Sequence, residues 1–144
     1  MVINAAAYTN VDGAESNEAL AFAINAEAPA RIAAETGRHG IPLIHISTDY
    51  VFDGKKGAPY VEQDPIGPVN AYGRSKGEGE RGVGAGNCQH IILRTSCVNV
   101  GNHRKSVCNS NVCMGAINDD QVFRAVDAVV PAPPPKTVEP RVRR

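Results

Sequence analysis

The sequence predicts an α/β fold, part of a Rossmann-like, doubly wound parallel sheet. Apolar runs of strand length lie at residues 1–7, 42–47 and 90–94. Helix-like stretches separate them, and the chain after each of the first two runs turns to small or hydroxyl-bearing residues. Strand and helix alternating at this spacing favour right-handed crossovers and a parallel sheet.

The three apolar runs differ in what they predict. Residues 1–7 are apolar without alternation apart from one Asn, which is typical of a buried strand in a sheet covered on both faces. A turn of small residues follows at residues 5–9. Residues 42–47 form the second predicted strand and residues 90–94 the third.

Two helices are expected between these strands. Over residues 16–37, Leu20 and Ile24 lie four apart and begin an apolar stripe, and acidic Glu15 near the start suits the helix dipole. Pro29 should kink or break this helix. After a long loop over residues 48–69, a further helix should begin near Asn70.

The pattern ends near residue 102. Residues 1–102 are expected to form the partial domain, which would lack the first, Gly-rich βαβ half of a Rossmann fold. Residues 103–144 show no sustained apolar period and contain a cluster of prolines, so we expect an irregular, poorly ordered tail.

Composition excludes several classes of function. The 144 residues are 42% hydrophobic, and 15 basic residues balance 15 acidic ones. Nucleic-acid and membrane-surface binders usually carry a basic excess. No apolar run approaches the ~20 residues of a membrane span, and no signal peptide is visible, so a cytoplasmic protein is expected. Cys108, Cys113 and His103 lack the second pair of a zinc site, so no metal site is predicted from them.

Tyr72 and Lys76 carry the clearest chemistry. Residues four apart stack on one face of a helix. A lysine ammonium stabilises the phenolate and lowers the pKa of the phenol, which makes proton transfer near neutral pH feasible. The bare pattern also occurs on helix surfaces without any function.

Two further segments strengthen the interpretation. Thr48 and Asp49 directly follow the second predicted strand, and Thr48 lies 24 residues before Tyr72. Ligands bind at the carboxyl edge of open parallel sheets, where the small-residue turn after the first strand should also lie. Asp49 is equally compatible with a loop or helix cap.

These strings resemble the dTDP-4-dehydrorhamnose reductase family of the extended short-chain dehydrogenase/reductases. The resemblance rests on residues 3–12 (INAAAYTNVD), 47–54 (STDYVFDG) and 72–76 (YGRSK), and extends over roughly residues 2–100. It implies NADPH- or NADH-dependent reduction of dTDP-4-dehydrorhamnose to dTDP-L-rhamnose, in dTDP-rhamnose biosynthesis.

The resemblance also implies roles for individual residues. Tyr72 would donate a proton to the C4 keto oxygen of the nucleotide sugar, and Lys76 would hold the nicotinamide ribose. Thr48 would bond the same keto oxygen, with Asp49 beside it on the substrate. The residues implied to line the dinucleotide are Ala6, Ala7, Tyr8 and Thr9. By family analogy, a homodimer and Mg²⁺ are further possibilities.

The sequence departs from the family in ways that predict weak or absent activity. A Gly-rich turn before the first strand is missing, so we expect a fragment incomplete at both ends. Cys97 stands where relatives carry a substrate-packing aromatic, and a thiol offers far less contact area. The family resemblance fades after Val100.

The glycines after Lys76 spell Gly-x-Gly-x-x-Gly over residues 77–82 but do not follow a strand, so we do not interpret them as a dinucleotide site. In a helix each costs about 1 kcal/mol relative to Ala, which predicts a damaged or relaxed helix.

Two alternatives remain open. One is a non-catalytic binding protein resembling the regulatory beta subunit of methionine adenosyltransferase, which has a similar string around residues 47–54. The other is a sugar-nucleotide epimerase or dehydratase, enzymes that share the Tyr-x-x-x-Lys pattern.

Overall fold

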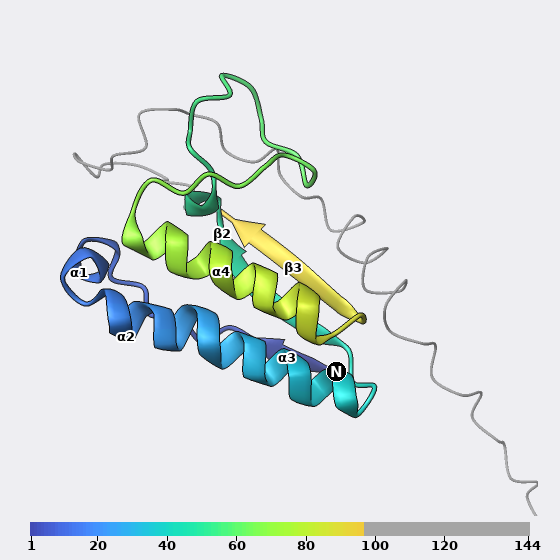
Figure 1. The fold of residues 1–144 in the computed structure, drawn as a ribbon. Coiled ribbons are helices and arrows are strands. Elements are labelled where there is room, and N and C mark those ends of the chain that lie inside the picture. Colours follow the sequence, from blue (N-terminus) through green and yellow to red (C-terminus); the bar gives the residue numbers. More distant parts are fainter. Residues whose placement is uncertain (97–144) are drawn as a thin grey trace, which may run out of the picture.

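A parallel sheet forms the centre of the computed structural model, which describes residues 1–96. The strands β1 (Val2–Asn4), β2 (Leu43–Thr48) and β3 (His90–Thr95) lie in the order β1-β2-β3. Both pairs are parallel, as Ile3 opposite Ile44 and Ile44 opposite Ile91 illustrate. The helices of this part of the chain lie on one face of the sheet (Figure 1). The predicted α/β class and parallel pairing are confirmed, although β1 is shorter than the apolar run.

The helical elements fall into two groups. Between β1 and β2 lie α1 (Val11–Ser16), α2 (Glu18–Phe22), the π-helical turn η1 (Ala23–Glu27) and α3 (Ala28–Arg38). Between β2 and β3 lie the 3₁₀ turn η2 (Asp49–Val51) and α4 (Ala71–Gly86). The helix predicted from Asn70 is confirmed, with Asn70 as its N-cap.

The first helical segment begins earlier than predicted, and of the kink or break predicted at Pro29 the break does not occur. It begins at Val11, because the Asn10 side chain caps it by accepting the N–H of Gly13 at 2.9 Å. Pro29 does not break the segment. In η1 the N–H of Ala28 bonds the carbonyl of Ala23, five residues back, so the hydrogen-bond ladder shifts just before the proline that cannot donate.

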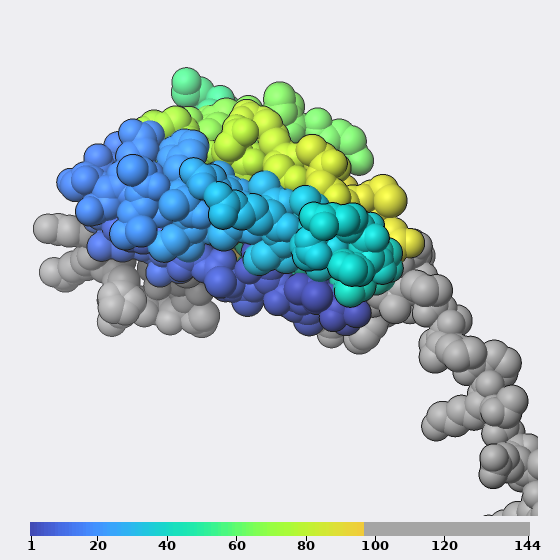
Figure 2. Space-filling view, turned by 60° about the horizontal axis from the view of Figure 1, so that its bottom comes forward, coloured from blue at the N-terminus to red at the C-terminus, as the bar shows by residue number. Residues whose placement is uncertain are grey.

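The glycines of α4 let it pack closely, so the prediction of a damaged helix is wrong. A Cβ added at Gly79 would lie 2.0 Å from the carbonyl oxygen of Asn25, and one at Gly82 would lie 2.7 Å from the Ala30 Cβ. In Figure 2 the blue-to-cyan helical segment runs the length of the molecule directly beside α4. The conformational cost of these glycines is offset by the contact they permit.

Two small hydrophobic clusters hold the layers together. One gathers Ala14, Ala21, Ala71 and Tyr72 near the start of α4. The other gathers Ala33, Leu43 and Val83 between α3, β2 and α4. No helix of residues 1–96 combines the length and apolar content needed to cross a membrane. The predicted tail, the boundary at residue 102 and Cys97 lie outside the described residues.

Candidate functional site

The carboxyl edge of the sheet brings together the segments that carry the predicted site residues. β1 and β2 are parallel, so the turn after β1 and Thr48 at the end of β2 share this edge. The start of α4, which carries Tyr72, meets the same region, because Tyr72 packs in one cluster with Tyr8 of the turn and Tyr50 of η2. Segments distant in sequence therefore come together at this edge.

Tyr72 is held in the first turn of α4. Tyr72 is only 9% exposed, and its ring packs edge to face against the ring of Tyr50, with the ring centroids 5.5 Å apart. The turn beneath it is fixed by Asn70, whose side chain accepts the N–H of Gly73 at 2.7 Å. The phenol thus projects from a capped and packed helix start.

Lys76 lies one turn further along α4 and is 2% exposed. Its Nζ donates to the carbonyl oxygen of Ile46 in β2 at 2.7 Å. Burial lowers the pKa of Lys76, and the nearby Glu80 carboxylate opposes that shift. An ammonium has three donors, so this bond fixes its direction while leaving capacity for further acceptors.

Thr48 and Asp49 form a small hydroxyl–carboxylate network after β2. Thr48 caps η2: its Oγ1 accepts the N–H of Tyr50 at 3.2 Å and donates to Asp49 Oδ1 at 3.1 Å. Asp49 Oδ2 accepts the hydroxyl of Ser96 at 2.8 Å. The cap is therefore Thr48 rather than Asp49, and Asp49 links the ends of β2 and β3.

Asn25 is a residue of this site that sequence reasoning missed. Buried at 1% exposure, its amide accepts the N–H of Tyr8 at 2.8 Å and donates to the Tyr8 carbonyl at 3.1 Å. It also donates to Ser75 Oγ at 3.0 Å, and Ser75 donates to the Tyr72 carbonyl at 2.8 Å. This chain of bonds ties the turn after β1 to α4. The available signal was an amide inside an apolar helical stretch.

His45 and Asn4 form a second support beneath the turn. Asn4 Oδ1 accepts the N–H of Ala6 at 3.2 Å, so its NH₂ group faces His45 Nδ1 at 3.2 Å. The His45 hydrogen then lies on Nε2, which has no hydrogen-bond partner within residues 1–96. Burial, with a smaller effect of the Lys76 charge, lowers the pKa of His45 to about 4.

An ion pair between α4 and β3 lies behind the site. Arg94 donates from Nε and Nη2 to the carboxylate of Glu80, with its shortest contact at 2.7 Å. The same carboxylate accepts the hydroxyl of Ser47 at 2.6 Å. Glu80 thereby joins β2, β3 and α4.

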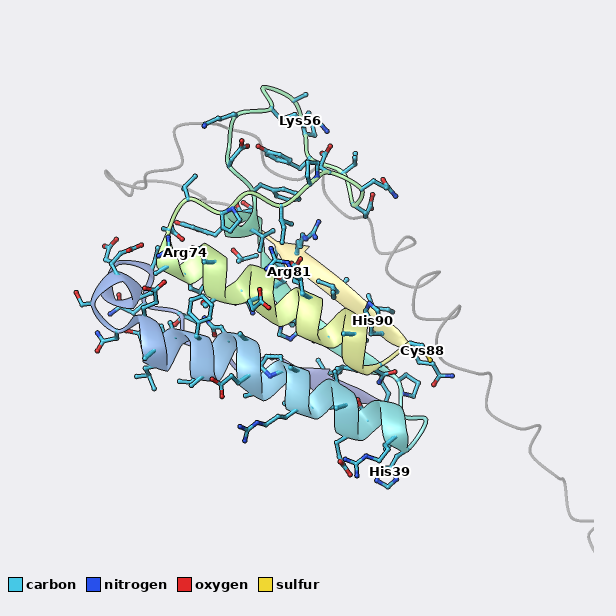
Figure 3. All side chains as sticks on the ribbon, viewed as in Figure 1. His39, Lys56, Arg74, Arg81, Cys88 and His90 are labelled. Atoms are coloured by element: carbon cyan, nitrogen blue, oxygen red, sulfur yellow. The ribbon has the colours of Figure 1, made fainter. Side chains whose placement is uncertain are left out.

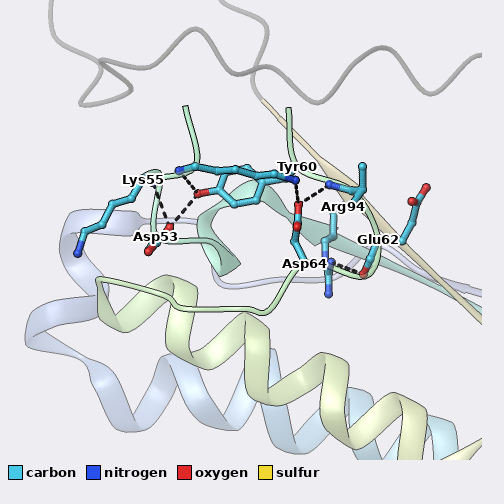
Figure 4. Close-up of polar contacts among 8 residues, drawn as sticks. Asp53, Lys55, Tyr60, Glu62, Asp64 and Arg94 are labelled. Carbon is cyan, nitrogen blue, oxygen red and sulfur yellow. Dashed lines mark hydrogen bonds and ion pairs between the residues drawn. The ribbon is translucent and has the colours of Figure 1, made fainter. Parts of the chain in front are cut away.

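The loop after η2 closes on itself (Figure 4). Tyr60 stacks on Phe52 with centroids 4.1 Å apart and donates to Asp53 at 2.8 Å. The loop surrounds a hollow of about 450 Å³ whose lining comes entirely from residues 53–67. None of the predicted site residues lines it. Within residues 1–96, no three His, Cys, Asp or Glu side chains gather where they could hold a metal ion.

The chain matches a known family over most of its length. A family model described as RmlD substrate binding domain matches residues 1–128. A dTDP-4-dehydrorhamnose reductase of Sinorhizobium fredii is 51% identical over 98 residues, covering 68% of this chain and 33% of that protein. This chain thus spans about a third of the length of the curated relatives it matches.

Solved structures give the same picture. The dTDP-4-dehydrorhamnose reductase of Clostridium acetobutylicum matches with a TM-score of 0.64 and 46% identity, over 65% of this chain and 34% of that one. The Bacillus anthracis reductase, solved in complex with NADP, matches with a TM-score of 0.64 and 42% identity, over 66% and 34%.

Proposed function

Because the chain belongs to the RmlD substrate binding domain family, we propose that it supplies the proton-donating part of a dTDP-4-dehydrorhamnose reductase site. The proposed reaction is the NADPH-dependent reduction of dTDP-4-dehydrorhamnose to dTDP-L-rhamnose. The observation that supports it most is that α4 places the Tyr72 ring beside Tyr50 of η2 and bonds Lys76 to β2, the strand that ends at Thr48.

The proposed chemistry divides between cofactor and chain. A bound nicotinamide supplies the hydride. Tyr72 gives its phenolic proton to the keto oxygen, and the ammonium of Lys76 stabilises the phenolate left behind. The Thr48 hydroxyl can turn from Asp49 toward the same keto oxygen. Its Oγ1 would still accept the N–H of Tyr50, and the Asp49 carboxylate would keep the bond from Ser96.

The turn after β1 suits the nicotinamide end of a dinucleotide. Ala6 and Thr9 are exposed there, and small side chains leave the backbone open to a flat ligand. Asn4 and Asn25 hold this turn from below, so its shape is set before a ligand arrives. Ala6, Ala7, Tyr8 and Thr9 are the proposed contacts. NADPH is favoured because a structural relative was solved with NADP.

The proposal concerns only what this chain contains. The described residues include no Gly-rich strand–turn–helix for the pyrophosphate, so we expect weak cofactor binding and low turnover from the chain by itself. Asp49 as a substrate contact, a homodimer and a cytoplasmic location stay predictions. Mg²⁺ finds no support in the described residues.

The regulatory-subunit and epimerase alternatives are not favoured. The relatives described above are named as reductases and match at 42–51% identity. No contact within residues 1–96 speaks for either alternative over a reductase.

The first test is titration of the 144-residue chain with NADPH, followed by nicotinamide fluorescence. We expect saturable binding that weakens at least tenfold in Lys76→Met, which keeps the apolar stem but removes Nζ. Lys55→Met, in the exposed loop, is the matched control and should bind like the wild type. Reductase activity, where detected, should disappear in Tyr72→Phe. Binding indifferent to Lys76 would refute the proposed cofactor face.

A further inference from the structure

Two residues of the segment from α1 to η1 form hydrogen bonds that reach the backbone of α4, one through a side chain and one directly. One is Asn25, which bonds Tyr8 and reaches α4 through Ser75. The other is Glu15 of α1, whose Oε1 accepts the backbone N–H of Ala71 at 2.7 Å, 56 residues away in sequence. The second contact falls on the backbone N–H of the residue directly before Tyr72.

The Ala71 amide is one that α4 cannot satisfy itself. The first four N–H groups of a helix have no partner within it. Asn70 takes the N–H of Gly73, and Glu15 takes that of Ala71. A carboxylate at this position is also favoured by the helix dipole. The first turn of α4 is therefore held partly by a residue of α1.

The ion pairs between these elements join side chains only. Arg74, which projects near the start of α4 (Figure 3), pairs with Glu18 at 3.0 Å and with Glu15 at 3.9 Å. These side chains are roughly half exposed, and such surface ion pairs contribute little. Glu18 thus resembles Glu15 in charge and exposure, but its contact with α4 is to the Arg74 side chain.

We propose that Glu15 is a positioning residue that sets the orientation of Tyr72. The inference rests on the proposed function, in which Tyr72 is the proton donor and the turn after β1 receives the cofactor. Its consequence is a coupling: α1 follows that turn directly, so a dinucleotide bound there also steadies the first turn of α4. Proton donor and cofactor contact then move as one unit.

Substitutions at Glu15 separate the hydrogen bond from the charge. Glu15→Gln keeps the length and an acceptor oxygen but loses the charge. Glu15→Asp keeps the charge but is one methylene too short to reach Ala71. We expect Gln to behave like the wild type and Asp to behave like Glu15→Ala. Glu18→Ala is the matched control and should leave every readout unchanged.

The readouts are made by NMR on the nucleotide-free 144-residue chain. In Glu15→Ala and Glu15→Asp the Ala71 amide should exchange about fivefold faster, as expected for loss of a bond of about 1 kcal/mol. The Tyr72 ring resonances, shifted by the Tyr50 ring, should move in the same two variants. A purely structural role would lower the urea midpoint without this selective ring shift.

Opposite results overturn the proposal. If Asp behaves like the wild type and Gln like Ala, the charge at the helix start matters and the bond does not. If Glu18→Ala shifts the Tyr72 ring as much as Glu15→Ala, the contact to Ala71 is not special. Should Glu15→Ala fail to fold, the comparison of Gln with Asp decides.

NADPH extends the same experiment to the coupling. Added NADPH should slow exchange of the Ala71 amide in the wild type and in Glu15→Gln, but not in Glu15→Asp. Slower exchange of the Ala71 amide in all three proteins, Glu15→Asp included, would overturn the coupling. If the wild type binds no NADPH, the proposed function fails, whereas the nucleotide-free measurements still decide the role of Glu15.

Discussion

His45 shows how a single residue supports the site without touching a ligand. It has no exposed surface, and it accepts a bond from Asn4, which in turn holds the amide of Ala6. Only the neutral ring fits this arrangement, because the Asn4 NH₂ group needs an acceptor at Nδ1. A charged ring would lose that bond and stand near the Lys76 ammonium.

Stability should therefore fall as the pH falls through the range of His45. In the unfolded chain the ring takes up a proton near the ordinary histidine pKa of 6.5, whereas in the folded chain it does so only at a pKa of about 4. Between these values the unfolded state binds more protons, so unfolding becomes easier by up to about 3 kcal/mol. Urea unfolding at pH 7 and pH 4.5 measures this loss. His45→Gln should lose less free energy of unfolding between these two pH values, whereas His39→Gln, on the exposed surface, should lose as much as the wild type. An equal loss in all three proteins would show that His45 does not cause the pH dependence.

Among the elements, α4 depends most on the smallest side chains. It carries Tyr72 and Lys76 of the candidate site, and its glycines at positions 79, 82 and 86 meet η1 and α3. Pro29 contributes here as well, since the Asn25 carbonyl cannot receive a bond from the proline nitrogen and instead lies against Gly79. The glycines thus lower the helix propensity of α4, but they stabilise it by allowing close packing against η1 and α3.

Two glycines of α4 should respond in opposite directions to alanine. Gly79→Ala places a Cβ 2.0 Å from the Asn25 carbonyl oxygen and should destabilise by about 1–3 kcal/mol through forced separation of the helices. Gly84→Ala meets only the His90 ring at 3.9 Å and should stabilise by about 0.5–1 kcal/mol. Urea midpoints of the two variants test this. Equal effects would mean that the glycines are not packing positions.

At the scale of the whole molecule, the ion pair of Glu80 with Arg94 joins the helical layer to the sheet. Glu80 of α4 bonds Arg94 of β3 and Ser47 of β2, and the Glu80 and Arg94 side chains are 5% and 18% exposed. A buried pair adds little net stability over apolar side chains of similar size, but removing one partner leaves the other charge buried and unpaired. Removing one partner of this pair should therefore cost more stability than removing both.

Single and double substitutions of Glu80 and Arg94 should show that removing one partner costs more stability than removing both. Glu80→Leu should destabilise by about 3 kcal/mol, and the double variant Glu80→Leu with Arg94→Met should recover most of that loss. Glu78→Leu is the matched control, since Glu78 pairs with Arg81 on the exposed face and should change stability by no more than about 0.5 kcal/mol. Additive losses in the double variant would show that the pair does not act as a unit.

The sequence by itself determined the features that depend on neighbours along the chain. The three strands, the N-cap of α4 at Asn70 and the spacing of Tyr72 and Lys76 follow from apolar runs, capping chemistry and helical periodicity. The class of the fold and the family resemblance rest on the same local strings.

Only the tertiary structure decided how those strings support one another. Asn25 bonds Ser75 across 50 residues and Glu15 bonds Ala71 across 56, and no local period marks such pairs. The α4 glycines likewise look unfavourable along the chain, because their benefit arises only where a second helix approaches. Local periodicity reports which face is apolar, whereas the partner of a buried polar group or of a glycine is set by the packing of the whole chain.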